Sequence, residues 1–322
     1  MKHIEVNIWK ACNNKCRFCM SAFVWNDEKE LTDFELVRKE IRTYADKGYQ
    51  SIGFLGWDIS IHPKVYEIVN EAKLCWFKRI HIVTNWMIFS DFKKAEMLVS
   101  AGVTRVNISV HSHESTAEDY LTQIPGWLIR KLKAIDNFNT LHNSWLLESK
   151  LSINLVLNQL NYRDILNTCV YFYKTRNIKD IRINYLWNRY FYTKEDKEKL
   201  ELSYIEFLPH LKQLIFLSTK SDLRITFDSI PPCIFNKIWC SDIECVIEKF
   251  LWEKGDHIEE ISNINKNEVF NWKEQKINKL KTKFKQCHEC VYSSECHWVW
   301  KEYAKRYWTS EFNPIKEQIC DT

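Results

Sequence analysis

Short runs of β-branched and apolar residues alternate with longer amphipathic stretches through the first two-thirds of the chain. The short runs have the pattern of buried strands. They predict strands at His3–Trp9, Ser51–Leu55, Arg79–Thr84, Arg105–His111, Leu151–Leu157 and Asp180–Leu186. The longer stretches, such as Thr32–Lys47 and Pro63–Trp76, repeat apolar residues at helical spacing. In the first these are Phe34, Val37, Ile41 and Tyr44, and in the second Val65, Ile68, Val69 and Ala72.

Strands that alternate with helices in this way predict parallel β/α crossover units. Their repeat length of roughly 30–40 residues fits a partial barrel or an open doubly wound sheet. A further long helix is expected from Thr193 to about Lys220. After it the periodicity breaks, and Leu223–Ile230 begins a cysteine-rich region. We therefore expect two domains, residues 1–220 and residues 221–322.

Composition narrows the class of protein. The chain has 322 residues, 45% of them hydrophobic and 27% charged, which is typical of a globular protein. Its formal net charge of +4 is spread without a basic tail, which argues against nucleic-acid binding. No apolar run reaches the ~18–20 residues of a membrane span, and the first residues lack the apolar core of a signal peptide. We expect a cytoplasmic protein that makes no use of a membrane.

The cysteines indicate metal or redox chemistry. Twelve of them occur in a chain without a secretion signal, where structural disulfides are rare. Cys12, Cys16 and Cys19 follow the first strand directly, at the carboxyl end where β/α folds place their chemistry. A structural zinc ion takes four closed ligands, usually as two pairs. Three thiolates on one loop instead suit a four-iron cluster whose fourth iron is open to bind something else.

This array, with Phe18 before its third cysteine, resembles that of the radical S-adenosylmethionine (radical SAM) superfamily. Four further segments match the family's order and spacing, namely FLGWDISIHP (54–63), TNWMIFSD (84–91), NISVHS (107–112) and INLVLNQLN (153–161). The resemblance covers about residues 1–190 and implies a partial (β/α)6 TIM-like barrel. It also implies a [4Fe-4S] cluster on Cys12, Cys16 and Cys19 that binds S-adenosylmethionine and cleaves it to a 5′-deoxyadenosyl radical.

The resemblance also assigns cofactor contacts. It places Asp58 on the methionine ammonium, and the set comprises Phe18, Gly56, Trp57, Asp58, Asn85, Ser109, His111 and Asn154. Two segments depart from the family. Its Gly-Gly-Glu is Gly56-Trp57-Asp58 here, and its Thr-Asn-Gly is Thr84-Asn85-Trp86. The two tryptophans either cap the barrel mouth or narrow the substrate cavity.

A second group of cysteines lies near the carboxyl end of the chain. Cys287, Cys290 and Cys296 form a C-x2-C-x5-C array, and Cys233 adds a fourth thiol from upstream. Four thiols suffice to close a second [4Fe-4S] cluster, although C-x2-C also occurs in zinc sites. The array resembles the twitch or SPASM auxiliary-cluster domain, so a small cysteine-rich auxiliary domain is expected.

The remaining cysteines fall into two groups. Cys75 and Cys169 lie on helical stretches and are most simply buried apolar residues. Cys240 and Cys245 are candidate catalytic hydrogen-atom donors to a substrate radical. They and Cys320 could equally be extra cluster ligands or inert.

The resemblance implies a radical enzyme that modifies a ribosomally synthesised precursor peptide by crosslinking, epimerisation or thioether formation. A small-molecule substrate such as a sugar, nucleoside or amino acid is the alternative with the same chemistry. A third possibility is a non-catalytic iron–sulfur scaffold whose cofactor site Trp57 and Trp86 close. The expected partners are the substrate and an electron donor such as flavodoxin or ferredoxin.

Overall fold

A curved sheet of nine strands organises the described part of the chain, in the order β7-β6-β5-β4-β3-β2-β1-β8-β9. The computed structural model describes residues 1–8, 11–19, 32–56, 58–186, 193–238, 243–251, 260–307 and 309–316. The sheet strands are β1 (His3–Asn7), β2 (Ser51–Leu55), β3 (Arg79–Thr84), β4 (Arg105–Ser109), β5 (Ser152–Leu157), β6 (Asp180–Tyr185), β7 (Arg224–Asp228), β8 (Glu260–Asn263) and β9 (Glu268–Phe270).

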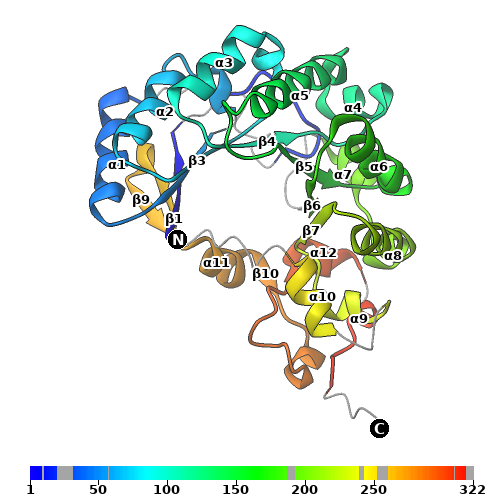
Figure 1. Cartoon of the computed structure of the whole chain (residues 1–322). Helices are drawn as coiled ribbons and strands as arrows, with labels where there is room; N and C mark the ends of the chain where they lie inside the picture. Colours follow the sequence, from blue (N-terminus) through cyan, green and yellow to red (C-terminus); the bar gives the residue numbers. More distant parts are fainter. Residues whose placement is uncertain are drawn as a thin grey trace.

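Helices follow the outer side of this sheet and make the crossovers between its strands (Figure 1). They are α1 (Phe34–Asp46), α2 (Val65–Leu74), α3 (Phe92–Ala101), α4 (Ser115–Thr122), α5 (Trp127–Asn143), α6 (Ile165–Arg176), α7 (Lys194–Leu200) and α8 (Tyr204–Lys220). The predicted fold class, a partial TIM-like barrel, is confirmed, and β2 and β3 have the predicted bounds.

The core lies between the sheet and these helices. Successive strand residues point to opposite faces, so Ile4 and Val6 of β1 are fully buried toward the helices. Glu5 lies on the other, inner face. Its carboxylate lies directly over Gly53, its partner in the neighbouring strand β2. A Cβ atom at Gly53 would come within 2.2 Å of the Glu5 carboxylate, so only glycine fits there.

Two predictions about residues 193–263 need correction. The predicted single helix at 193–220 is two helices, because Ser203 starts α8 with a capping box that it forms with Glu206. The sheet also continues past the predicted boundary near residue 220. Strand β7 pairs in parallel with β6, and β8 pairs in parallel with β1.

The cysteine-rich region lies beside α8 at one edge of the sheet (Figure 1). It contains α9 (Pro232–Asn236), α10 (Ile243–Phe250), α11 (Trp272–Gln275), β10 (Lys281–Thr282), β11 (Val299–Trp300) and α12 (Lys301–Arg306). An aromatic contact joins it to the barrel helices. The Tyr303 hydroxyl accepts a hydrogen bond from the Tyr204 backbone N–H at 2.9 Å, and the two ring centroids lie 4.6 Å apart.

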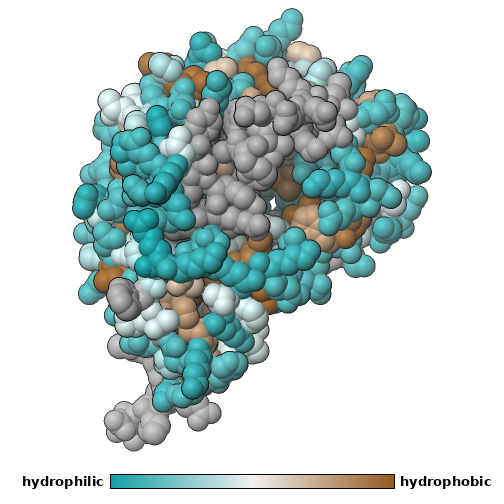
Figure 2. All heavy atoms as spheres, turned by 180° about the vertical axis from the view of Figure 1, so that it is seen from behind, coloured by the Kyte–Doolittle hydropathy of each residue, from teal (hydrophilic) through white to brown (hydrophobic). Residues whose placement is uncertain are grey.

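The surface seen from behind is mostly hydrophilic, with hydrophobic residues in small groups (Figure 2). Among the described residues, no helix combines the length and the apolar character needed to cross a membrane.

Trp86 is part of the core, which contradicts both interpretations of its side chain. It is fully buried, and its indole N–H donates to the Asn107 carbonyl at 2.7 Å. Its ring packs on Phe89 and Phe138, with centroids 5.0 and 4.7 Å away. The backbone at Trp86 is left-handed, with φ of 67°. The indole therefore neither caps the barrel mouth nor narrows a cavity.

The left-handed backbone at Trp86 gives a prediction about stability. Trp86→Ala and Trp86→Gly should both lower the free energy of unfolding by about 3–5 kcal/mol, because both remove a buried ring. The glycine variant should be the more stable of the two by about 1 kcal/mol, since alanine is strained at positive φ. Phe138 is equally buried but lies within helix α5, where glycine is less favourable than alanine. Phe138→Ala should therefore be more stable than Phe138→Gly. Urea unfolding of the four variants checks this, and the same order at both positions would contradict it.

Candidate cofactor and cluster sites

The three-cysteine loop is attached to the carboxyl end of helix α4. The backbone N–H of Lys15 donates to the Thr122 carbonyl at 3.3 Å, and that of Arg17 donates to the Leu121 carbonyl at 3.0 Å. The last carbonyls of a helix have no partner within the helix, so the loop supplies donors that this helix end needs. The Arg17 guanidinium also pairs with buried Asp196 at 2.7 Å. These contacts hold the loop across the carboxyl ends of the strands.

Hydrogen-bond donors surround the thiols of this loop. The Asn14 backbone N–H lies 3.3 Å from Cys12 Sγ, and the amides of Asn14 and Asn85 lie 3.7 Å from the sulfurs of Cys16 and Cys12 respectively. Burial, followed by the charge of Cys19, raises the pKa of Cys16 to about 12. Burial also raises the pKa of Cys12, and Asp58, Cys16 and Cys19 raise it further. The three thiols therefore lie within electrostatic reach of one another.

This environment fits an iron–sulfur cluster. Ligating cysteines must be thiolates, which buried and crowded thiols become only beside positive charge. Irons would supply that charge, and the nearby N–H groups would stabilise the sulfurs. Among the described residues, no three His, Cys, Asp or Glu side chains are spaced to share one metal ion. A four-iron cluster needs a wider arrangement, because each thiolate binds a different iron.

A buried ion pair lies behind the loop, and the sequence analysis missed it. Lys131 Nζ contacts Glu118 Oε1 at 2.5 Å, and both side chains are fully buried. Lys131 also donates to the Ser109 carbonyl at 2.6 Å, while Glu118 Oε2 accepts the backbone N–H groups of His111 and Ser112 at 2.8 and 2.9 Å. Burial favours the neutral acid, but Lys131 and these hydrogen bonds outweigh it and lower the pKa of Glu118.

The ion pair fixes the end of β4, which carries two predicted cofactor contacts. A signal for it existed in the sequence, because Lys131 occupies a buried position on α5 in the same stripe as Leu128 and Ile135. A lysine in an apolar stripe requires a partner, since an unpaired buried charge is costly.

His111 joins this network to the cysteine loop. Its ring meets the predicted residue Phe18 edge-on, with centroids 4.7 Å apart, and its Nδ1 accepts the Val156 backbone N–H at 3.2 Å. Burial lowers the pKa of His111 to about 4. The imidazole is therefore neutral at ordinary pH, and its predicted contact with the cofactor stays a prediction.

The other predicted strand-end residues lie side by side. Ser109 of β4 and Asn154 of β5 are partners in the strand register. The Asn154 side-chain oxygen Oδ1 accepts a hydrogen bond from the Asn184 side-chain amide at 2.6 Å. All three side chains are partly exposed, so a polar row crosses the inner face at this end of the barrel. Asn184 was not among the predicted residues.

Asp58 is engaged within the protein. It is fully buried, and its Oδ1 accepts hydrogen bonds from the Ser60 backbone N–H at 2.8 Å and from the Thr84 hydroxyl. Its Oδ2 accepts the Asn85 backbone N–H at 3.3 Å. The side chain thus ties the loop after β2 to the end of β3. Its predicted contact with the methionine ammonium stays a prediction.

Two neighbours complete this part of the site. The Asn85 amide donates to the Asn13 side-chain oxygen at 2.6 Å, which joins the end of β3 to the cysteine loop. Gly56 is half-buried at the end of β2, and Trp57 lies outside the described residues.

The four cysteines of the second group line one cavity, together with Pro231, Pro232 and Phe312. Burial, and then the charges of Cys296, Cys287 and Cys290, raise the pKa of Cys233. The Cys296 sulfur accepts the Trp298 backbone N–H at 3.3 Å. Cys233 lies in the first turn of α9, because Pro232 starts that helix. The structure therefore brings together the four thiols predicted to hold a second cluster.

The remaining cysteines differ in their surroundings. Cys245 is exposed on α10 and does not line the four-cysteine cavity. Its predicted role as a hydrogen-atom donor stays a prediction, and Cys240 and Cys320 lie outside the described residues. Cys169 is fully buried in the core, as predicted, whereas Cys75 is only half-buried.

A partial parallel barrel with three cysteines after its first strand defines a class of enzymes. Residues 6–168, about half of the chain, match the Radical SAM superfamily, and the chain belongs to that superfamily. The family implies one [4Fe-4S] cluster and S-adenosylmethionine, which the residues around Cys12, Cys16 and Cys19 fit.

Curated relatives match part of the chain. Molybdenum cofactor biosynthesis protein 1 of Dictyostelium discoideum is 27% identical over 189 residues, which cover 57% of this chain and 28% of that protein. The GTP 3′,8-cyclase of Staphylococcus epidermidis is 22% identical over 187 residues, which cover 56% of this chain and 52% of the cyclase. The matches thus span about half, or less, of these relatives.

Solved structures match more of the chain. The crystal structure of Streptococcus suis SuiB bound to S-adenosylmethionine has a TM-score of 0.66 at 16% identity, and the match covers 99% of this chain and 77% of SuiB. Native anSMEcpe with bound AdoMet and Cp18Cys peptide has a TM-score of 0.56 at 15% identity, and the match covers 70% of this chain and 63% of that one. These likenesses show the fold.

The low pKa of His111 predicts a loss of stability on acidification. An imidazole in the unfolded chain has a pKa of about 6.5. Just below that pH the unfolded chain binds a proton at this histidine, whereas the folded protein does not. Neutral His111 therefore makes its full contribution to the free energy of unfolding above about pH 6.5. This contribution declines as the pH falls to about 4, where the histidine of the folded protein titrates. From about pH 7.5 to about pH 5 it should fall by about 2 kcal/mol.

Urea unfolding of the wild type and of His111→Gln over this pH range measures how much of the change in the free energy of unfolding comes from His111. Glutamine is chosen because it keeps an acceptor for the Val156 backbone N–H. Burial also lowers the pKa of His62 to about 4. His62 is present in both proteins, so its effect on the pH dependence of unfolding cancels in the comparison. Parallel pH profiles for the two proteins would show the prediction to be wrong.

Proposed function

We propose that the chain is a radical SAM enzyme that modifies a ribosomally synthesised precursor peptide, by crosslinking, epimerisation or thioether formation. The observation that carries the substrate class is the likeness to SuiB, which extends over 99% of this chain. One matched structure is SuiB bound to precursor peptide SuiA, with a TM-score of 0.64. The superfamily match itself carries the radical chemistry.

In this proposal Cys12, Cys16 and Cys19 hold the first cluster. When bound, the cluster supplies the electron that cleaves S-adenosylmethionine to methionine and a 5′-deoxyadenosyl radical, which abstracts hydrogen from the substrate. The chain holds the loop on α4 and stabilises the sulfurs through Asn14 and Asn85. Contacts to the cofactor come from Phe18, Gly56, Trp57, Asp58, Asn85, Ser109, His111 and Asn154. A flavodoxin or ferredoxin would first reduce the cluster, and so is the original source of that electron.

The first test removes the three loop cysteines. Combined Cys12→Ala, Cys16→Ala and Cys19→Ala should lower the iron content of anaerobically reconstituted protein by about half and abolish formation of 5′-deoxyadenosine under dithionite. Cys169→Ala, which removes a thiol from the core, is the control and should keep both. Cleavage of S-adenosylmethionine by the triple variant would refute the proposed site.

We further propose that Cys233, Cys287, Cys290 and Cys296 hold a second [4Fe-4S] cluster in a twitch- or SPASM-like region that follows β7. The support is their shared cavity and the electrostatic coupling of Cys233 to the other three thiols. Four thiolates fill all positions of such a cluster and close it to substrate. Zinc on the same four thiols, the alternative raised by the C-x2-C spacing, would require them to move closer together, because their spacing in the structure does not suit one metal ion.

Single variants test this second site. Cys233→Ala should remove the iron of the second cluster and destabilise the surrounding residues, while leaving the formation of 5′-deoxyadenosine measurable. Cys245→Ala, a matched change at an exposed position of α10, should keep the full iron content. Iron and zinc are measured by elemental analysis. Zinc in place of iron, or a Cys233→Ala variant with both clusters, would contradict the assignment.

A small-molecule reaction is the second candidate, and the similarity to GTP 3′,8-cyclases favours it. Formation of 5′-deoxyadenosine that depends on added GTP would support this candidate over the peptide. The non-catalytic scaffold has less support, because the Trp86 side chain that was expected to close the cofactor site lies in the core.

A further inference from the structure

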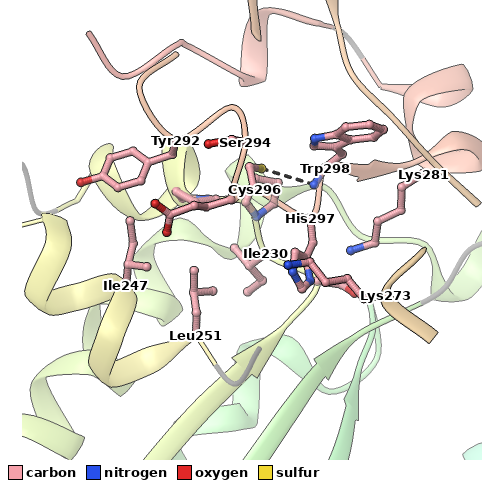
Figure 3. A pocket seen from close by; sticks show the side chains of 14 residues that line it. Ile230, Ile247, Leu251, Lys273, Lys281, Tyr292, Ser294, Cys296, His297 and Trp298 are labelled. Carbon is pink, nitrogen blue, oxygen red and sulfur yellow. Dashed lines mark hydrogen bonds between the residues drawn. The ribbon is translucent and has the colours of Figure 1, made fainter. Parts of the chain in front are cut away.

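A second cavity of about 290 Å³ adjoins the four-cysteine cavity, and Cys296 lines both. Its walls come from the segment after β7, from α10 and α11, from β10 and from residues 292–298. The pocket therefore lies between the carboxyl end of a barrel strand and the proposed second cluster (Figure 3). Its size suits one or two amino-acid residues, since pockets for whole small molecules begin at roughly this volume.

The two sides of this pocket differ in chemistry. Ile247 of α10 and Leu251 just after that helix lie on one side, and the side chains of Lys273, Lys281 and His297 gather on the other (Figure 3). Among the described lining residues, Glu295 is acidic and exposed, whereas Lys273 and Lys281 carry positive charge. Within this described lining, the two ammonium groups outnumber the one carboxylate.

Lys281 places a buried ammonium group on the cationic side of the pocket. Its side chain is only 2% exposed, and its ammonium lies 4.5 Å from the centre of the Trp300 ring. The ring face offsets part of the cost of burying the charge. An anion held in the same low-dielectric surroundings would interact with this ammonium more strongly than in water.

We propose that this pocket binds a carboxylate-bearing part of the substrate whose neighbouring group is apolar, such as an aspartate or glutamate next to a large aliphatic residue in a peptide. The proposal rests on the peptide substrate proposed above. Lys273 and Lys281 would contact the carboxylate, and Ile247 and Leu251 would receive the aliphatic side chain. The apolar side favours a peptide over a phosphate group, whose charged oxygens would lie against Ile247 and Leu251. The pocket would hold the peptide beside the second cluster.

The test uses two nearly isosteric peptides, N-acetyl-Leu-Asp-amide and N-acetyl-Leu-Asn-amide, which differ in one negative charge. Calorimetric titration of the reconstituted full chain should show the acidic peptide binding about tenfold more tightly, as expected for a charge-assisted hydrogen bond. Lys281→Gln and Lys273→Gln should each remove most of this preference. Lys273 is exposed, so its variant is informative even if Lys281→Gln fails to fold.

Lys305→Gln is the matched control, because it removes the same charge from an exposed position of α12 outside the pocket and should keep the preference. Equal binding of the two peptides, no binding of either, or a preference that survives both pocket variants would overturn the proposal. Tighter binding of GTP that the same variants weaken would overturn it in favour of a phosphate. The titrations omit S-adenosylmethionine and reductant, so their outcome is independent of whether the protein forms 5′-deoxyadenosine.

Discussion

The parallel pairing of strands β1 to β8 is the constraint on which the rest of the structure depends. Parallel strands end at the same edge, so segments far apart in the sequence meet there. The loop of Cys12, the bend at Asp58 and the turn at Asn85 follow strands at this edge, and the paired residues Ser109 and Asn154 lie within β4 and β5. Hydrogen bonds link the first three, from the Asn85 backbone N–H to Asp58 and from the Asn85 amide to Asn13 of the cysteine loop.

Several charged and polar side chains are buried at this edge of the sheet. The Glu118–Lys131 pair and His111 are buried together with the backbone they hold. Burying such groups costs free energy that hydrogen bonds recover only when every partner is in place. This requirement narrows the conformations open to the end of β4, because any shift would leave a charge or an N–H group without its partner. The contact between His111 and Phe18 transmits that order to the cysteine loop.

The carboxyl-terminal region depends on a different kind of contact. Its described helices are short, and aromatic packing between Tyr303 of α12 and Tyr204 of α8 joins it to the barrel. Two distant segments bring their thiols to one cavity, Cys233 from α9 and the other three from residues 287–296. The cluster proposed there would tie the two segments together, because its ligands come from both.

The sequence by itself determined the strands, their parallel order and the local cysteine loop, because strand periodicity and residue spacing are properties of short segments. It also grouped the four cysteines that line one cavity in the structure, three of which are close neighbours in the chain. Only the tertiary structure decided the position of Trp86, whose left-handed turn places the ring in the core. The same holds for the pairing of Glu118 with Lys131 and for the continuation of the sheet into β7 and β8. Each of these depends on contacts between segments far apart in the chain, and local patterns of residue types do not record which distant partner a buried group will meet.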